Sequence, residues 1–280
     1  MRVCPYFILK RRIHLELKRV LTVAGSDPSG GAGIQADLKT ISALGAYGMS
    51  VITALTAQNT YGVQDIYEIP PEFVEKQFDS VAGDIGIDAL KTGMLVKGSI
   101  VAVVSNKIKE FNIKKVVVDP VLAATDGISL LSIEARVILV RDLLPLALVA
   151  TPNIPEAEVL SGIRIASRND MENAAKAIFS CGAKSVLIKG GHLEGPAVDL
   201  FYDGHNFHAF SCERINTRST HGTGCTLASA IATGLAQNLS VLEAIDRAKQ
   251  YVTLAIRHSL ALGRGRGPVN HLVSFTGCSF

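Results

Sequence analysis

Short apolar runs alternate with longer segments of helical periodicity along most of the chain. The runs are rich in Val, Ile and Leu and are bounded by Gly, Pro, Asn or Asp, which is typical of buried strands. They cover residues 20–24, 50–54, 89–92, 115–119, 147–151 and 185–189. Between them, apolar residues recur at helical spacing over residues 34–44, 71–81, 99–111, 133–144 and 170–181. This alternation predicts βαβ units and an α/β fold with a mostly parallel sheet and helices on both faces.

The last third of the chain departs from this alternation. Two further runs, 197–202 and 207–212, flank Asp203-Gly204 and predict a small hairpin at one edge of the sheet. Two long helical patterns follow, over residues 224–237 and 241–262. No repeat, linker or composition break divides residues 19–280, so we expect a single domain there. Residues 1–18 form a basic lead without a small-residue cleavage site, and we interpret them as an extension outside the core.

Composition and charge exclude several classes of protein. Hydrophobic residues make up 48% of the 280, which is too many for a disordered chain. The most apolar stretch, residues 137–150, is interrupted by Arg141, Asp142 and Pro145, so it cannot span a membrane. The net charge is only +3, and aromatic residues amount to 6% with no Trp. We therefore expect neither a membrane nor a nucleic-acid partner.

The cysteines indicate a reducing compartment rather than a disulfide framework or a metal site. The chain has five of them, an odd number, and no two form a C-x-x-C pair. This pattern suggests neither a disulfide framework nor a zinc site. A reducing cytoplasm is therefore the expected setting.

Small, polar and ionisable residues follow the predicted strands. Ligands of open α/β sheets bind beyond the carboxyl ends of the strands, so these residues are expected on one rim. They are Gly25-Ser26-Asp27, Gln58-Asn59-Thr60, Gly93-Met94, Asp119-Pro120-Val121, Thr151-Pro152-Asn153 with Glu156, and Lys189-Gly190-Gly191.

Two glycine-rich loops precede helices. In the first, residues 24–33, the pattern Gly31-x-Gly33-x-x-Ala36 matches a dinucleotide fingerprint only weakly, because no acidic residue follows the next strand; a plain βα turn is the alternative. In the second, residues 220–226, Gly222 and Gly224 let the backbone approach a ligand, and the helix start favours a phosphoryl group.

Cys225 stands in the first turn of the helix that follows this second loop. The field at a helix N-terminus lowers the pKa of a cysteine and favours its thiolate, so we expect a reactive group. The alternative is an inert, buried cysteine that fills space.

At these loops the sequence resembles the bacterial hydroxymethylpyrimidine/phosphomethylpyrimidine kinases of thiamine biosynthesis, which are members of the ribokinase-like superfamily. The resemblance runs from about residue 19 to residue 272. The motifs that carry it, in order, are residues 24–37, 57–60, 91–95, 119–121, 151–157, 189–192, 220–227 and 267–271. It implies a three-layer ribokinase-like fold and ATP-dependent phosphorylation of 4-amino-5-hydroxymethyl-2-methylpyrimidine, then of its monophosphate. By analogy it also implies a homodimer.

The resemblance assigns the phosphate side of the site. Most ribokinase relatives place an Asp where Cys225 stands, as the base that takes the substrate hydroxyl proton. Positioning and charge neutralisation matter more than the base in phosphoryl transfer, so a thiolate is sufficient in principle. The other residues are Gly222, Thr223 and Gly224 as an N–H cradle for phosphoryl oxygens, Lys189 on the ATP phosphates, and Asn153 and Glu156 as the N-x-x-E motif that holds Mg²⁺ largely through water. Asp119 ends a predicted strand on the same rim and can attract metal or the ATP phosphates; its alternative is a turn residue. The alternative for Lys189 is a surface lysine at the end of a strand.

The resemblance also assigns a pyrimidine slot. A carboxamide has both donor and acceptor, so Gln58 can pair with the ring nitrogen and exocyclic amine of an aminopyrimidine. Met94 offers a polarizable contact for the flat ring, while Val121 and Gly25 shape the slot. Asp37 resembles the family's carboxylate near the substrate. Each of these residues apart from Gln58 also has a plain packing or helix-surface interpretation.

Some positions differ from the family pattern. Asp126-Gly127-Ile128 replaces a Ser-Gly-Asp turn, Asn216 replaces an Asp, and the Gly-Arg-Gly-Arg-Gly run at residues 263–267 replaces a version that contains His. These changes concern the nucleotide side and the flap more than the pyrimidine slot.

Two alternative functions stay open from the sequence. Pyridoxal also presents a hydroxymethyl group on a flat nitrogen ring, so a pyridoxal kinase is the first. The second is a pyrimidine-binding sensor without catalysis, against which the presence of Lys189, Glu156 and Cys225 argues.

Overall fold

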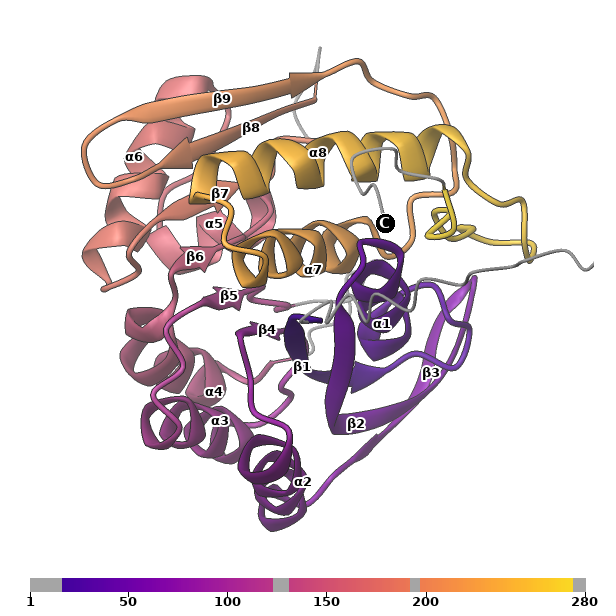
Figure 1. Ribbon diagram of the computed structural model, residues 1–280. Coiled ribbons are helices and arrows are strands. Elements are labelled where there is room, and N and C mark those ends of the chain that lie inside the picture. The colour runs from indigo at the N-terminus through magenta and orange to yellow at the C-terminus, as the bar shows by residue number, and fades with distance from the viewer. Residues whose placement is uncertain (1–16, 123–130, 192–196, 274–280) are drawn as a thin grey trace, which may run out of the picture.

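The computed structural model describes residues 17–122, 131–191 and 197–273, and within them nine strands form a single sheet (Figure 1). The strand order is β3-β2-β1-β4-β5-β6-β7-β8-β9. The strands are β1 (Arg19–Ser26), β2 (Tyr47–Asn59), β3 (Gly62–Glu68), β4 (Ala89–Thr92), β5 (Val116–Val118), β6 (Val149–Ala150), β7 (Val186–Ile188), β8 (Ala197–Tyr202) and β9 (Phe207–Cys212).

The central part of the sheet is parallel. β2, β1, β4, β5, β6 and β7 pair in parallel, while β3 is antiparallel to β2 at one edge. At the other edge β8 and β9 form an antiparallel hairpin next to β7. The predicted α/β class, the mostly parallel sheet and the edge hairpin are confirmed.

Helices cover both faces of the sheet (Figure 1). One apolar core joins the sheet to the helices that lie between β3 and β7 in the chain, and the second joins it to α1, α7 and α8. The helices are α1 (Gly33–Ala43), α2 (Pro71–Asp84), α3 (Gly98–Glu110), α4 (Ile133–Ile138), α5 (Ile154–Ser161), α6 (Arg168–Ser180), α7 (Thr223–Ala236) and α8 (Val241–Arg257). The three-layer arrangement is therefore as predicted.

Some predicted boundaries were wrong. The strand predicted over residues 50–54 extends to Asn59, because its second half pairs with β3 as an exposed ribbon. The helix predicted over residues 133–144 is α-helical only to Ile138; a π turn over Leu139–Leu143 and a short 3₁₀ turn then lead past Pro145, whose ring opposes a regular helix. α8 ends at Arg257, ahead of Gly263 and its neighbours.

The strand order creates the crevice where the site lies. β1 stands between β2 and β4, so the chain leaves β1 toward one side of the sheet and returns to the other side for β4. Loops diverge at such a switch point and leave a hollow at the carboxyl ends of the strands.

No helix in the described part of the chain is long and apolar enough to cross a membrane. Residues 1–16 of the predicted extension, and Asp126, Gly127 and Ile128, lie outside the described residues.

Candidate functional site

A cavity of about 210 Å³ lies at the carboxyl ends of the parallel strands. Its wall brings together every residue that the sequence assigned to the site except Asp37. Those residues are Gly25, Gln58, Met94, Asp119, Val121, Asn153, Glu156, Lys189, Gly222, Thr223, Gly224 and Cys225. The start of α7 thus lies at a cavity that is also lined by residues of β1 and β2 and of the loops after β4, β5, β6 and β7.

The two glycine-rich loops pack against each other at this cavity. Gly222 has a left-handed backbone with φ of 83°, and a Cβ there would collide with the carbonyl oxygen of Gly31. Only glycine fits such a position. Gly222 is also the N-cap of α7 and provides no side-chain cap. The Thr223 N–H donates to the Thr220 carbonyl oxygen at 3.3 Å, which leaves the neighbouring N–H groups of Gly222 and Gly224 for an anion.

An ion cluster adjoins the start of α7. Nζ of Lys189 lies 2.7 Å from Oδ1 of Asp119 and 4.0 Å from Oε2 of Glu156. A Cβ on Gly224 would lie 3.2 Å from the same Nζ, so the lysine reaches the glycine loop. Burial alone would lower the pKa of Lys189, but Asp119 and Glu156 outweigh it and raise that pKa. Lys189 therefore stays charged at neutral pH.

Asn153 and Glu156 form the capping box of α5. Oδ1 of Asn153 accepts from the Glu156 N–H at 2.9 Å, and Oε2 of Glu156 accepts from the Asn153 N–H at 2.8 Å. Burial raises the pKa of Glu156 to about 7; Lys189 lowers it in part, and Asp119 raises it. A positive charge beside this carboxylate would favour its ionised form.

Cys225 is placed as predicted, but its predicted electrostatics were wrong. Part of its surface opens to the cavity and protein surrounds the rest, and this burial raises the pKa of the Cys225 thiol to about 11. The nearby ammonium of Lys91 opposes the rise without cancelling it. Desolvation thus outweighs the helix N-terminus, and the group is mostly a thiol at neutral pH.

Asp37 lies under the cavity and does not reach its surface. Its side chain is completely buried and binds Lys91 Nζ at 2.8 Å through Oδ2. Oδ2 also accepts from Thr22 Oγ1 at 2.6 Å, and Oδ1 accepts from Ser229 Oγ at 2.6 Å. The carboxylate is used to neutralise Lys91, and its contact with the substrate stays a prediction.

Gly25, Met94 and Gln58 form another part of the cavity wall. A Cβ on Gly25 would collide with the methyl group of Met94, so these two residues define a narrow slot. Thr53 Oγ1 fixes the Met94 backbone by donating to its carbonyl oxygen at 2.6 Å. Gln58 brings its carboxamide into the same cavity from within β2, rather than from beyond the strand as predicted.

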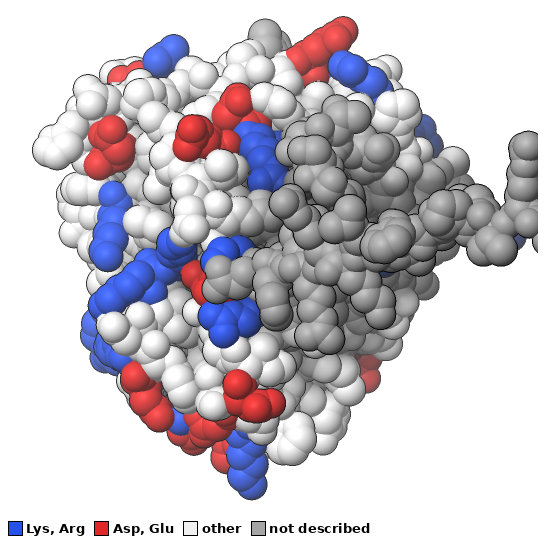
Figure 2. Space-filling view, viewed as in Figure 1, with Lys and Arg blue, Asp and Glu red and all other residues white. Residues whose placement is uncertain are grey.

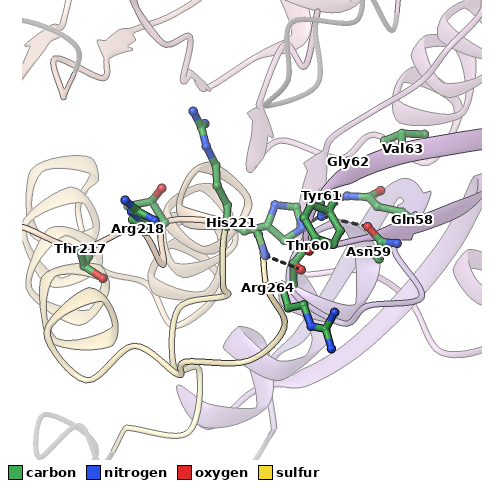
Figure 3. Close-up of a pocket in the computed structure, with 13 residues that line it drawn as sticks. Gln58, Asn59, Thr60, Tyr61, Gly62, Val63, Thr217, Arg218, His221 and Arg264 are labelled. Atoms are coloured by element: carbon green, nitrogen blue, oxygen red, sulfur yellow. Dashed lines mark hydrogen bonds between the residues drawn. The ribbon is translucent and has the colours of Figure 1, made fainter.

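A larger outer hollow of about 700 Å³ adjoins the slot (Figure 3). Gln58, Val63, Thr220 and His221 line both spaces, so they separate the slot from the outer hollow. The remaining wall comes from the turn between β2 and β3, from Thr217 and Arg218 ahead of α7, and from the loop that follows α8.

Sequence reasoning gave no role to three of the residues in the slot, Asp27, Lys91 and His221. Signals existed for each: Asp27 is on the predicted rim, His221 is in the second glycine loop, and Lys91 interrupts an otherwise apolar strand. A lysine there requires a buried partner, which the sequence alone does not identify.

Charge elsewhere on the molecule is mixed. In Figure 2, Lys and Arg are interspersed with Asp and Glu over the coloured part of the visible face. Within the cavity, Lys189 and the start of α7 are the features that can attract an anionic ligand, although Asp119 and Glu156 lie beside that lysine.

The fold and this cavity define an enzyme that transfers phosphoryl groups, and comparisons with known proteins agree. Residues 27–270 match the family model described as phosphomethylpyrimidine kinase. The chain belongs to this family of kinases. It is 49% identical over 255 residues to the hydroxymethylpyrimidine/phosphomethylpyrimidine kinase of Rhizobium meliloti, covering 90% of this chain and 96% of the relative.

A bifunctional relative matches over part of its length. The thiamine biosynthesis bifunctional protein ThiED of Geobacter sulfurreducens is 52% identical over 268 residues. These are 95% of this chain but 55% of that protein, so the chain spans about half the length of the relative.

Two solved structures show the same fold. The phosphomethylpyrimidine kinase from Clostridium difficile aligns with a TM-score of 0.77 and 45% identity, covering 85% of this chain and 99% of that one. The pyridoxal kinase from Staphylococcus aureus in complex with AMP-PCP aligns with a TM-score of 0.86 and 40% identity, covering 91% and 94%.

Proposed function

We propose that the protein phosphorylates 4-amino-5-hydroxymethyl-2-methylpyrimidine with ATP, and then its monophosphate to the diphosphate, in thiamine biosynthesis. The observation that carries this proposal is the single cavity that Gln58, Lys189, Cys225 and the uncapped start of α7 all line. A flat acceptor and a phosphoryl donor can therefore meet in one place. Relatives at about half identity over nearly the whole chain carry the corresponding name.

The slot suits an aminopyrimidine. Gln58 offers a donor and an acceptor to the ring edge, and Met94 and Val121 offer apolar surface to the ring. Gly25 leaves the space that a side chain would fill. These contacts orient the hydroxymethyl group toward the glycine loop.

The other end suits the phosphates of ATP. Lys189 supplies a fixed positive charge, and the N–H groups of Gly222 and Gly224 supply donors for oxygens on which negative charge develops. Asp119 holds Lys189 in place at 2.7 Å. The similar pyridoxal kinase from Staphylococcus aureus was solved with AMP-PCP, an ATP analogue, which supports a nucleotide as the phosphoryl donor.

The residues present also fit Mg²⁺. Among the described residues no group of three His, Cys, Asp or Glu side chains could cage a metal ion. Mg²⁺ does not need such a cage, because it keeps several waters and uses phosphate oxygens beside one or two protein oxygens. Glu156, Asn153 and Asp119 would supply those oxygens. When bound, the ion would neutralise charge on the phosphates.

Cys225 is the proposed base. It would accept the proton of the attacking hydroxyl while the glycine loop and Lys189 hold the phosphoryl group. Because phosphoryl transfer has a loose transition state, orientation and charge contribute most, and a weakly ionised thiol is compatible with turnover.

A pyridoxal kinase is the second candidate. The favouring observation is the TM-score of 0.84 to 0.86 to pyridoxal kinases at about 40% identity. ADP release with Mg²⁺, ATP and each alcohol separates the two candidates. No ADP release despite binding of the pyrimidine would establish a sensor instead.

A variant without the Lys189 charge tests the role of this lysine in the same ADP-release assay. We expect Lys189→Met to raise KM for ATP and lower kcat, whereas Lys114→Met, on an exposed loop, leaves both unchanged. The chain is further proposed to act as a homodimer in the cytoplasm, by analogy with its family; size-exclusion chromatography with light scattering tests the dimer.

A further inference from the structure

Two polar side chains flank the carboxamide of Gln58. Thr56 Oγ1 lies 3.1 Å from the Gln58 atom placed as Oε1. His221 Nε2 lies 3.4 Å from the atom placed as Nε2, and Figure 3 shows these two side chains on one wall of the outer hollow. Nitrogen and oxygen of a carboxamide have nearly the same shape, so its orientation must be decided from the partners.

The single hydroxyl proton of Thr56 determines which end of the Gln58 carboxamide faces Thr56. The same Oγ1 lies 2.9 Å from the carbonyl oxygen of Ser26, and this oxygen can only accept. A hydroxyl has one proton, which goes to Ser26. Toward Gln58, Thr56 can then only accept, so the NH₂ of Gln58 must face Thr56.

The hydrogen bond between His221 and Asp27 determines which end of the Gln58 carboxamide faces His221. His221 Nε2 lies 2.8 Å from Oδ2 of Asp27, whose carboxylate also accepts from the backbone N–H groups of Ser29 and Ala32. Burial alone would raise the pKa of Asp27, but the hydrogen bonds from His221 and Ser29 lower it to about 2. An ionised Asp27 can only accept, so Nε2 carries a proton and donates it to Oδ2. This protonated nitrogen has no lone pair to accept from an NH₂, so the oxygen of Gln58 is the end that can lie beside it at 3.4 Å.

Both ends require the same orientation. We propose that Thr56, His221 and Asp27 are positioning residues that lock the Gln58 carboxamide with its NH₂ toward Thr56 and its oxygen toward His221, and so select the hydrogen-bonding edge of the substrate. The N–H of Gln58 that does not face Thr56 can then donate to a ring nitrogen of the substrate. The remaining lone pair of the Gln58 oxygen can accept from the neighbouring amine of the substrate. The selectivity rests on the proposed function, whereas the orientation itself does not.

The backbone supports this lock over a long chain separation. Asp27 and His221 are 194 residues apart, and both lie on the glycine loops that pack together. His221 is held by its N–H to the Gly267 carbonyl at 3.1 Å. Neither ring nor carboxylate is free to turn, since both are nearly buried.

A substrate pair tests the selectivity. The 4-oxo analogue of the pyrimidine alcohol reverses donor and acceptor, so it fits only a turned carboxamide. Wild type should prefer the 4-amino compound by at least ~100-fold in kcat/KM. Thr56→Val should reduce that preference about tenfold, and Thr56→Ser should retain it because it keeps the hydroxyl.

Matched controls separate selectivity from stability. Thr253→Val loses a hydroxyl that donates within α8 to the Lys249 carbonyl, and it should leave the preference unchanged. An equal preference in Thr56→Val and wild type would overturn the selectivity, as would an equal loss in Thr56→Ser and Thr56→Val.

A measurement without substrate tests the orientation. In ¹⁵N NMR of the histidine rings, assigned by comparison with His221→Phe, Nε2 of His221 should be protonated at neutral and mildly alkaline pH. An unprotonated Nε2 would overturn the lock. A protonated Nε2 without turnover of the pyrimidine would overturn the proposed function and support the lock.

Discussion

The ammonium group of Lys91 lies 2.8 Å from Oδ2 and 3.0 Å from Oδ1 of Asp37, and neither side chain has exposed surface. Burial alone would lower the pKa of Lys91, but Asp37 outweighs it and raises that pKa, with smaller support from Cys225 and Asp119. A positive charge is thus fixed beside the cavity without reaching solvent.

Removing one partner of this pair should be costly. We expect Asp37→Asn to lower the free energy of unfolding by about 3–5 kcal/mol, because it leaves Lys91 charged and buried. The double variant Asp37→Leu with Lys91→Met should recover a large part of that loss. Urea unfolding measures both. A loss below ~1 kcal/mol in Asp37→Asn would show that the pair is not desolvated as described.

A pH dependence of stability should follow from His271. Burial, with Lys39 and His221 nearby, lowers the pKa of His271 from 6.5 to about 4, so the folded chain keeps this ring neutral while the unfolded chain protonates it. Its contribution is present above pH ~6.5 and is lost as the pH falls toward ~4. We expect a loss of about 2–3 kcal/mol over this window, and His271→Gln should flatten that part of the curve. The same slope in both proteins would contradict the assignment.

The base should be visible in a pH–rate profile. Because the pKa of Cys225 is about 11, a thiolate mechanism predicts that kcat rises from about pH 7 to about pH 9. Cys225→Asp places an already ionised group there, so its profile should be flat, and Cys225→Ala should lower kcat by ~10²-fold with the fold intact. Wild-type turnover in Cys225→Ala would remove the role of this residue.

Gln58 should affect binding of the pyrimidine, which accepts the phosphoryl group, and not binding of ATP. Gln58→Ala removes both hydrogen bonds to the ring edge, so we expect KM for the pyrimidine to rise ~10- to 100-fold with KM for ATP nearly unchanged. Steady-state kinetics with each substrate varied in turn gives both values. As a control, Gln64→Ala alters an exposed glutamine in β3 and should change neither value. A parallel rise in both KM values for Gln58→Ala would indicate general damage to the site.

Local patterns were sufficient for most of the elements of the fold, but not for β3 or α5. The parallel strands are buried on both faces and read as continuous apolar runs, as at Val116–Val118, so periodicity identified them. β3 was missed because Gly62–Glu68 mixes polar and apolar residues, none of them buried, and depends on pairing with β2. The extra length of β2 has the same cause.

The expectation that ligands bind beyond the carboxyl ends of the strands identified most residues of the site, but not their charge interactions. Asp37 lies on the helix where it was expected, yet its partner Lys91 is 54 residues away, and no local pattern links them. The same holds for Asp27 and His221, 194 residues apart. The raised pKa of Cys225 depends on how completely protein surrounds the thiol, which the helix position alone does not reveal.

The central claim is that this cavity phosphorylates an aminopyrimidine alcohol. The most direct measurement is kcat/KM, from ADP release with Mg²⁺ and ATP, for 4-amino-5-hydroxymethyl-2-methylpyrimidine and for pyridoxal, with the products separated by chromatography. The structure predicts higher kcat/KM for the pyrimidine and successive appearance of its monophosphate and diphosphate. Higher kcat/KM for pyridoxal, or no phosphorylated pyrimidine, would contradict it.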